Sequence, residues 1–262
     1  MGEKKQSGET HRGNATHRVL VALCSVVFAV SVMGLAFIGC SYLQAGSKYD
    51  DLARNVTDLN SSDAHLSLQD MTADWEHLRD ENPDVVGWVY MPGTNVNYPI
   101  VQGDDNEEYL HKNFSGDEDG VVHTGCIFLN CENAADYSDM VSTIFGHNMQ
   151  DGSMFGQLAQ MADEGDFQDH DTLYVLTPSA NYQVKLFAVS KISSQDTGVM
   201  RRGYSSPAAL QDYATDLSAT AQVKLNDVPV SPEQLIQLVT CVDAAAETRY
   251  LIVGYVEDTA EL

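Results

Sequence analysis

A thiol, an imidazole and a guanidinium stand in short motifs of this chain. His147 lies in the segment Gly146-His147-Asn148, Cys241 ends an apolar run, and Arg249 follows eight residues later. Cysteine catalysis needs a thiolate, a group that moves protons and a donor that stabilises negative charge developing on the substrate. In this interpretation Cys241 is the nucleophile, His147 is the general acid and base, and Arg249 is a permanent cation with forked donors.

Each of these residues, taken alone, has an ordinary structural explanation. A cysteine in an apolar strand is usually a small core residue, and a histidine at a strand end is usually a solvated polar group. If His147 is not the catalytic imidazole, other histidines of the chain are candidates for that role. Outside the N-terminal part these are His111, His123 and His170.

The elements that must position these residues are short strands. Apolar runs bounded by turn residues predict strands at 85–90, 96–101, 125–130, 140–145, 173–177, 182–190, 234–241 and 249–256. Evenly spaced short strands with few helices favour a mainly β fold, a closed or nearly closed barrel. By strand parity Cys241 shares a face with Val239, and Arg249 shares one with Leu251 on the next strand. If the last two strands pair through the loop at 243–247, Cys241 and Arg249 emerge at the same rim.

Helical periodicity appears in a few places. Apolar residues at spacings of three and four predict one helix with Tyr49 and Leu52 and a second with Leu68 to Leu78, separated by a break at 60–63. A further helix is predicted at 153–161. The pair Ser206-Pro207 predicts the capped start of another helix.

The N-terminal part is typical of a membrane anchor. Residues 1–18 form a basic tail, and residues 19–43 contain no charged side chain, which is long enough to cross about 30 Å of hydrocarbon. Because the positive flank precedes the apolar run, we expect a cytoplasmic N-terminus and an extracellular remainder. The alternatives are a cleaved signal peptide and a lipoprotein signal at Cys40, although Phe37 stands where such signals usually have leucine.

The composition is strongly acidic, with a formal net charge of −24. The tail holds two acidic and four basic residues, which leaves 36 acidic and 10 basic residues after it. Such a surface excludes nucleic-acid binding through a basic patch. It also disfavours a thiolate, so a reactive Cys241 requires a cation close by.

The cysteines and histidines do not form a recognisable metal or disulfide pattern. Cys24 and Cys40 lie in the apolar segment, and Cys126, Cys131 and Cys241 form an odd set in the remainder. Neither a C-x-x-C pair nor an H-E-x-x-H motif occurs in the sequence. We therefore expect no metal site and no cofactor.

Three segments together resemble class B sortases, the cysteine transpeptidases of Gram-positive cell surfaces. They are 146–155 with His147, 82–103 beginning with Asn82-Pro83, and 238–249 with Thr240-Cys241 and Arg249. The resemblance implies an eight-stranded sortase β-barrel with N-terminal helices and a helix inserted between strands 6 and 7, preceded by one transmembrane helix. The expected organisation is a cytoplasmic tail at 1–18, an anchor at 19–43, a helical stalk or linker at 44–70 and a catalytic domain at 71–262.

The resemblance also implies an activity. A membrane-anchored enzyme of this class cleaves a C-terminal sorting signal of secreted proteins through a thioester on Cys241, and joins them to an amine of peptidoglycan or its precursor. By position, Asn106, Leu110 and Thr240 match residues that bind the sorting peptide. Asn106 has an alternative role as a turn cap, and Leu110 as a core residue.

Other functions remain open at this level. The acceptor amine could belong to a pilin lysine, which would make the enzyme a pilus polymerase. A non-catalytic surface domain that binds peptides is the alternative from another class, but it has no reason to retain Cys241, His147 and Arg249 together. A papain-like hydrolase is disfavoured because there the cysteine precedes the histidine.

Overall fold

The computed structural model describes residues 10–56, 67–117, 125–167, 170–196, 198, 203–241 and 247–262, without the side chains of 10–16, 41–45, 55, 56 and 241. The chain divides into two compact units, Met1–Ala45 and Gly46–Leu262. The first unit consists of helix α1 (Thr10–Val56) up to residue 45. Its segment His17–Cys40 has a mean hydropathy of 2.6 and is long and apolar enough to cross a membrane.

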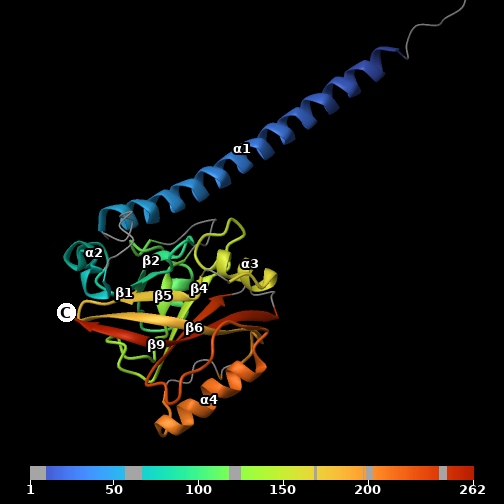
Figure 1. The fold of residues 1–262 in the computed structure, drawn as a ribbon. Helices are drawn as coiled ribbons and strands as arrows, with labels where there is room; N and C mark the ends of the chain where they lie inside the picture. Colours follow the sequence, from blue (N-terminus) through green and yellow to red (C-terminus); the bar gives the residue numbers. More distant parts are fainter. Residues whose placement is uncertain are drawn as a thin grey trace, which may run out of the picture. The chain divides into compact units, whose positions relative to one another are not determined.

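The second unit is built mainly from strands (Figure 1). The strands are β1 (Val85–Tyr90), β2 (Asn97–Val101), β3 (Ile127–Leu129), β4 (Val141–His147), β5 (Thr172–Leu176), β6 (Ala180–Ser193), β7 (Val223–Lys224), β8 (Leu235–Cys241) and β9 (Thr248–Glu261). The helices are η1 (Leu68–Asp70), α2 (Trp75–Glu81), η2 (Glu108–Leu110), α3 (Gly156–Glu164) and α4 (Pro207–Thr220).

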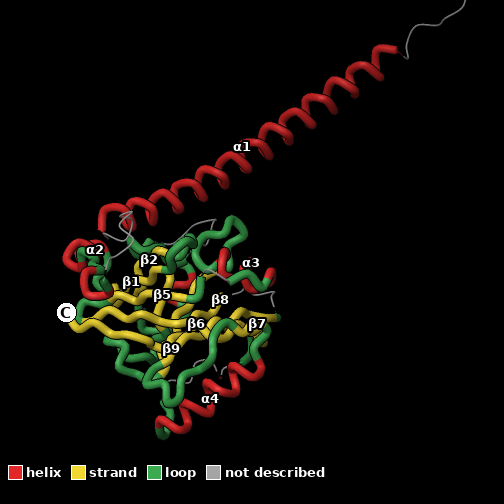
Figure 2. The backbone as a smooth tube through the Cα atoms, viewed as in Figure 1, coloured by secondary structure: helices red, strands yellow, loops and turns green. Residues whose placement is uncertain are grey.

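The strands form a closed barrel. Hydrogen bonding follows the order β5-β1-β2-β3-β4-β8-β9-β6, and a further pairing between β5 and β6 closes the ring of eight strands. Strand β7 adds to the side of β6 and is not part of the ring. Figure 2 shows the strands gathered at the centre with helical segments around them. The predicted closed barrel of eight strands is confirmed.

The register of the central strands is fixed by buried aliphatic side chains. Ile144, Leu238, Ile252 and Val189 pair in turn across β4, β8, β9 and β6, and each is at most 1% exposed. Burial of one such side chain stabilises the fold by about 1.5–3 kcal/mol. A shift by one residue would turn this row to the opposite face, so the row also determines where each strand ends.

Helix α4 lies between the sixth and seventh strands of the barrel, as the resemblance predicts. Ser206 caps its first turn by accepting a hydrogen bond from Ala209 N at 3.2 Å, and Pro207 occupies the first helical position. Leu210 and Ala214 are its fully buried contacts. This agrees with the helix start predicted from the pair Ser206-Pro207.

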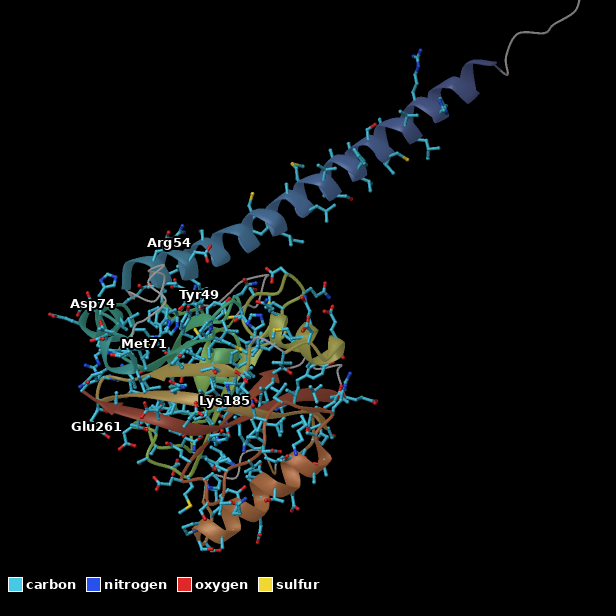
Figure 3. All side chains as sticks on the ribbon, in the orientation of Figure 1. Tyr49, Arg54, Met71, Asp74, Lys185 and Glu261 are labelled. Carbon is cyan, nitrogen blue, oxygen red and sulfur yellow. The ribbon has the colours of Figure 1, made fainter. Side chains whose placement is uncertain are left out.

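The predicted helix containing Leu68 to Leu78 is wrong in its continuity. The chain forms the short helix η1 and becomes extended at Met71, and α2 begins after Asp74. Figure 3 labels Met71 and Asp74. The Asp74 carboxylate accepts from His77 N and caps α2. Asn181 of β6 donates to the carbonyls of Leu68 and Met71 at 2.8 and 2.7 Å, and these bonds replace the helical ones.

The end of α1 packs within the second unit. Tyr49, Leu52 and Ala53 are buried there, and Lys48 forms an ion pair with Glu81 at 3.2 Å. The side-chain pattern that predicted a helix around Tyr49 therefore reflects packing on the barrel. The predicted break at 60–63 and the loop at 243–247, apart from its last residue, lie outside the described residues.

Candidate active site

His147 and Cys241 are the last residues of two neighbouring strands. Strands β4 and β8 are parallel, and their register runs from Val141 opposite Leu235 to His147 opposite Cys241. Since hydrogen-bonded strands lie about 4.8 Å apart, the two backbones are close at this point. The structure therefore brings together two residues that are 94 positions apart in the sequence, at the same end of the barrel.

Arg249 lies on the other side of Cys241. Strand β9 is antiparallel to β8, and their register includes Val239 opposite Leu251. Beyond this pair Tyr250 N donates a hydrogen bond to Thr240 Oγ1 at 2.9 Å, so the same register continued by one more residue sets Arg249 opposite Cys241. Strand β6 flanks Arg249 with Ile192. Cys241 is thus placed between the strand of His147 and the strand of Arg249.

The guanidinium of Arg249 has unused hydrogen-bonding capacity. The Nε atom is buried and has no hydrogen-bond partner, and no described carboxylate forms an ion pair with this side chain. An unpaired buried donor is destabilising by about 1–3 kcal/mol. Such a group is a frequent sign of a site that binds a negatively charged or strongly polar ligand.

The imidazole of His147 is oriented by a backbone carbonyl. Its Nε2 lies 2.8 Å from the carbonyl oxygen of Leu110, and because a carbonyl can only accept, Nε2 carries the proton. Gly125 packs directly on the ring, since a Cβ atom added there would lie 2.7 Å from His147 Cδ2. The ring is therefore held from two sides, and Nδ1 is the nitrogen that can take up or release a proton.

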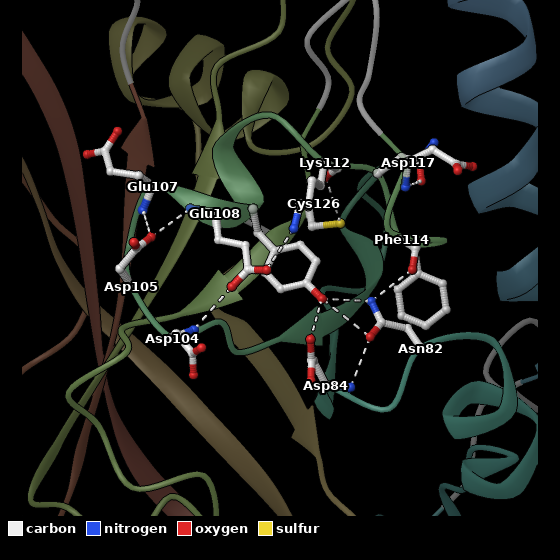
Figure 4. Close-up of polar contacts among 12 residues, drawn as sticks. Asn82, Asp84, Asp104, Asp105, Glu107, Glu108, Lys112, Phe114, Asp117 and Cys126 are labelled. Carbon is white, nitrogen blue, oxygen red and sulfur yellow. Dashed lines mark hydrogen bonds and ion pairs between the residues drawn. The ribbon is translucent and has the colours of Figure 1, made fainter.

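The loop that provides the Leu110 carbonyl is tightly clamped (Figure 4). Asp105 accepts from the backbone N–H groups of Glu107 and Glu108, both at 2.9 Å. Tyr109 donates to Asp84 at 2.7 Å. Burial and this bond to Asp84 raise the pKa of Tyr109 well above its usual value, so its hydroxyl remains a donor. The carbonyl that faces His147 is thus fixed by the loop around it.

The predicted peptide-binding residues have three different environments. Asn106 is half-buried and accepts from Cys131 N at 2.9 Å while it donates to Asn130 at 3.0 Å. Leu110 is half-buried and lies at His147. Thr240 is fully buried and holds β9 through Tyr250. Any influence of Thr240 on a peptide must therefore act through the spacing of the strands.

A cavity of about 390 Å³ lies between β6, α4 and the segment that precedes α4. Tyr204 and Tyr213 stack in its wall with ring centroids 5.1 Å apart, and Leu251 of β9 belongs to its lining. Ile192, which pairs with Arg249, lines it as well. The cavity is apolar and aromatic in part, adjoins the strand of Arg249, and has a volume that suits a few peptide side chains.

The other candidates are placed elsewhere or are not described. His170 Nδ1 lies 3.0 Å from the carbonyl of Pro92, and His123 falls outside the described residues. Within the part of the chain that the structure describes, no group of three or more His, Cys, Asp or Glu side chains is arranged to hold a metal ion. His111 is exposed and follows Leu110 in the chain. The register of β4 and β8 sets His147 beside Cys241.

Two residues of this region were not predicted from the sequence. Gly125 contacts the imidazole and has a φ of +56°, and the hydroxyl of Tyr49 donates to its carbonyl at 2.9 Å. A glycine before a strand and a tyrosine in a helical stripe carry no signal of this kind. Their roles are visible only in the folded chain, where the Tyr49 hydroxyl meets the Gly125 carbonyl across 76 residues of sequence.

Comparison with known proteins identifies the family to which this chain belongs. Residues 89–257 match the sortase domain. Sortase B of Listeria monocytogenes is 29% identical over 192 residues, 73% of this chain and 75% of that protein. Sortase B of Staphylococcus aureus is 29% identical over 182 residues, 68% of this chain and 72% of that protein. A sortase B structure from B. anthracis has a TM-score of 0.70 at 25% identity and covers 84% of this chain and 99% of its own.

The chain therefore belongs to the sortase family, whose members are cysteine transpeptidases. Its curated relatives and structural neighbours are sortases B, so the resemblance to class B is confirmed.

Proposed function

We propose that this chain is a membrane-anchored sortase that cleaves a C-terminal sorting signal of secreted proteins and transfers them to an amine of peptidoglycan or its precursor. The observation that carries the proposal is the common end of β4, β8 and β9. At this end of the barrel His147 pairs with Cys241, and the register between β8 and β9, continued by two residues, sets Arg249 opposite Cys241. In this proposal Cys241 is the nucleophile, His147 the proton carrier and Arg249 the oxyanion donor.

In the first step Cys241 gives its thiol proton to His147 Nδ1, and the resulting thiolate forms a bond to the scissile carbonyl carbon. The carbonyl oxygen takes up the displaced electron pair and becomes an oxyanion. Arg249 donates hydrogen bonds to this oxygen, and such a donor typically accelerates the step by about 10²–10³-fold. The buried Nε without a partner supports this role. The surrounding charge of −24 makes a local cation the more important for a thiolate.

The second step breaks the scissile C–N bond. The electron pair of the oxyanion re-forms the carbonyl, and the leaving amine takes a proton from His147 Nδ1. The hydrogen bond from Nε2 to the Leu110 carbonyl supports this assignment, because it keeps one ring nitrogen protonated throughout. The product is a thioester on Cys241. An incoming amine then loses its proton to Nδ1, attacks the thioester and releases the sulfur.

The sorting peptide is proposed to lie along the cavity beside α4 and to reach Cys241 past Arg249. Tyr204 and Tyr213 provide an aromatic wall, and Leu251 provides part of the floor. Asn106 and Leu110 are proposed to flank the peptide on the side of His147, where Leu110 is half-buried. Thr240 supports this groove through its bond to Tyr250.

The membrane orientation follows from charge. The basic tail precedes the apolar segment of α1, which favours a cytoplasmic N-terminus and an extracellular catalytic domain. This places the thiol on the side where secreted substrates and the amines of peptidoglycan are found.

The test uses the full chain in nanodiscs with a panel of sorting-signal peptides, with and without hydroxylamine, and with Cys241→Ala as the control. Hydroxylamine is a small amine that resolves a thioester to a hydroxamate. The proposal predicts a hydroxamate of the cleaved peptide from the wild type and none from Cys241→Ala. If no peptide in the panel is cleaved while Cys241 reacts with iodoacetamide, the result favours an unusual sorting signal or a domain that only binds peptides.

A further inference from the structure

The position of the His147 ring depends on two backbone segments that the mechanism does not use. Gly125 packs on the imidazole itself, at a distance where a methyl group would lie 2.7 Å from Cδ2 and 2.9 Å from Nε2. Met154 forms a bridge with Asn148, the residue after His147, and Phe155 N donates to the His147 carbonyl at 2.9 Å. One segment limits the ring, and the other limits the backbone from which the ring projects.

Both segments are held by one pair of tyrosines. The Tyr49 hydroxyl donates to the Gly125 carbonyl at 2.9 Å, and the Tyr98 hydroxyl oxygen accepts from Met154 N at 3.1 Å. The two rings meet edge to face with centroids 5.5 Å apart. Both side chains are buried. The pair therefore connects the two segments that surround His147.

The backbone at both contacts lies in the left-handed region, which is strained only for the residue that has a side chain. Gly125 has a φ of +56° and Met154 a φ of +52°, and for a residue with a side chain the left-handed region costs about 1–2 kcal/mol. Burial raises the pKa of Tyr98 to about 12, so its hydroxyl stays neutral at ordinary pH. The Tyr98 hydroxyl thus bonds the backbone N–H of a strained residue, Met154, and the Tyr49 hydroxyl bonds the carbonyl of Gly125, which adopts its positive φ without strain.

Tyr49 comes from an unexpected part of the chain. It lies near the end of α1, outside residues 89–257 that match the sortase domain, and is labelled in Figure 3. Leu52 and Ala53 on the next turn are buried with it, and Lys48 pairs with Glu81. The end of α1 is therefore an integral part of the barrel unit.

We propose that Tyr49 is a positioning residue for His147. Its hydroxyl holds Gly125 against the imidazole, and its ring supports Tyr98, which holds Met154. This inference rests on the proposed catalytic role of His147. The end of α1 that carries Tyr49 would then have two roles. It connects the barrel to the anchor, and it sets the geometry of proton transfer at His147.

The experiment replaces Tyr49 by Phe in the full chain in nanodiscs, which removes one hydroxyl and keeps the ring. Tyr98→Phe is the second variant. The matched control is Tyr174→Phe, because Tyr174 also stacks on a tyrosine, Tyr90, but belongs to β5. The readouts are kcat and KM for hydroxamate formation, the melting temperature, and the NMR signal of the His147 Nε2–H proton.

Tyr49→Phe is expected to lower kcat by roughly ten-fold, because small displacements of catalytic groups have effects of this size. KM should change by less than about two-fold, since this contact does not bind the peptide. Loss of one hydrogen bond should lower the melting temperature by only about 2–5 °C. The His147 ring proton should exchange faster with water. Tyr98→Phe should act in the same direction, and Tyr174→Phe should leave all four readouts unchanged.

The inference is overturned if Tyr49→Phe keeps kcat within about two-fold of the wild type. It is also overturned if kcat falls only in proportion to the fraction of unfolded protein. A wild type without turnover would instead overturn the proposed function. The ring-proton signal would still decide the role of Tyr49 in that case, since an unchanged signal in Tyr49→Phe excludes it.

Discussion

His147 and Cys241 end two parallel strands at the same register position. Seven consecutive pairs, from Val141 opposite Leu235 onwards, lead to this position, and the fully buried Ile144 and Leu238 form one of them. A rigid, buried sheet therefore sets the distance between the two residues. This arrangement suits proton transfer, which requires the groups to be held in place before the substrate arrives.

Arg249 should contribute to activity and reduce stability. Arg249→Met removes the proposed oxyanion donor, and kcat/KM for hydroxamate formation should fall by about 10²–10³-fold. Since Nε is buried without a partner, the same change should leave the free energy of unfolding unchanged or raise it by about 1 kcal/mol. Urea unfolding and peptide kinetics measure the two effects.

The matched control for Arg249→Met is Arg79→Met on the exposed side of α2, which should alter neither quantity. A loss of stability of more than about 2 kcal/mol in Arg249→Met would contradict the account, because the arginine would then be a structural residue.

Gly125 should be required for its size as well as for its backbone conformation. Gly125→Ala places a methyl group 2.7 Å from His147 Cδ2 at a φ of +56°, so kcat should fall sharply as the ring is displaced. Gly116 provides the control, because it has a φ of +80° and nothing within 4 Å of an added Cβ.

Gly116→Ala should lose about 1–2 kcal/mol of stability from the positive φ, as measured by urea unfolding. Gly125→Ala should lose more, because its methyl group would also lie 2.8 Å from the carbonyl oxygen of Tyr109. Gly116→Ala should nevertheless keep full activity. Equal activities of the two variants would show that the contact between Gly125 and the imidazole has no catalytic importance.

Thr240 should act through its hydroxyl. Thr240→Val leaves the buried N–H of Tyr250 without its acceptor, so the free energy of unfolding should fall by about 1–3 kcal/mol. Thr240→Ser retains the acceptor and should lose less, mainly the packing of one methyl group. Urea unfolding of both variants is the measurement. If serine is as destabilising as valine, the hydroxyl contributes nothing.

Stability at acid pH should depend on Asp171. Burial acts to raise its pKa, but hydrogen bonds from Lys185, Asn226 and Thr172 together lower it below the usual 3.8. A carboxyl whose pKa is lower in the folded state adds stability above its unfolded pKa and loses it as the pH falls through its folded pKa. Stability should therefore decline below about pH 4.

Asp171→Asn tests this dependence by urea unfolding between pH 3 and pH 7. The variant should be less stable than the wild type at pH 7, where Lys185 has lost its charged partner at 2.7 Å, and the difference should shrink toward pH 3. A constant difference across this range would exclude the carboxylate as its source.

The strands and the three chemical groups could be predicted from the sequence, because apolar runs and short motifs are local. The end of β9 could not. Its predicted end at Val256 is followed by polar residues, yet the strand continues to Glu261, which pairs with Ala180 of β6. Backbone pairing with a long neighbour stabilises this segment without burial, and apolar periodicity does not detect such a contribution.

The positions of the helices show the same limit. The helix predicted at 153–161 begins only at Gly156, because Met154 has a positive φ and bridges to Asn148. The contacts that orient His147 likewise join distant segments, as with Leu110 and Gly125. The register between β4 and β8 depends on the closed barrel, so short sequence motifs indicate the candidate residues of the site but not their arrangement.

The central claim is that Cys241 forms a thioester with the cleaved peptide. Intact-mass spectrometry of the full chain, quenched in acid soon after mixing with a cleavable sorting peptide, tests it most directly. The account predicts an adduct with the mass of the acyl fragment, located on Cys241 by peptide mapping, removed by hydroxylamine and absent from Cys241→Ala. Cleavage that proceeds in Cys241→Ala, or an adduct on another residue, would contradict it.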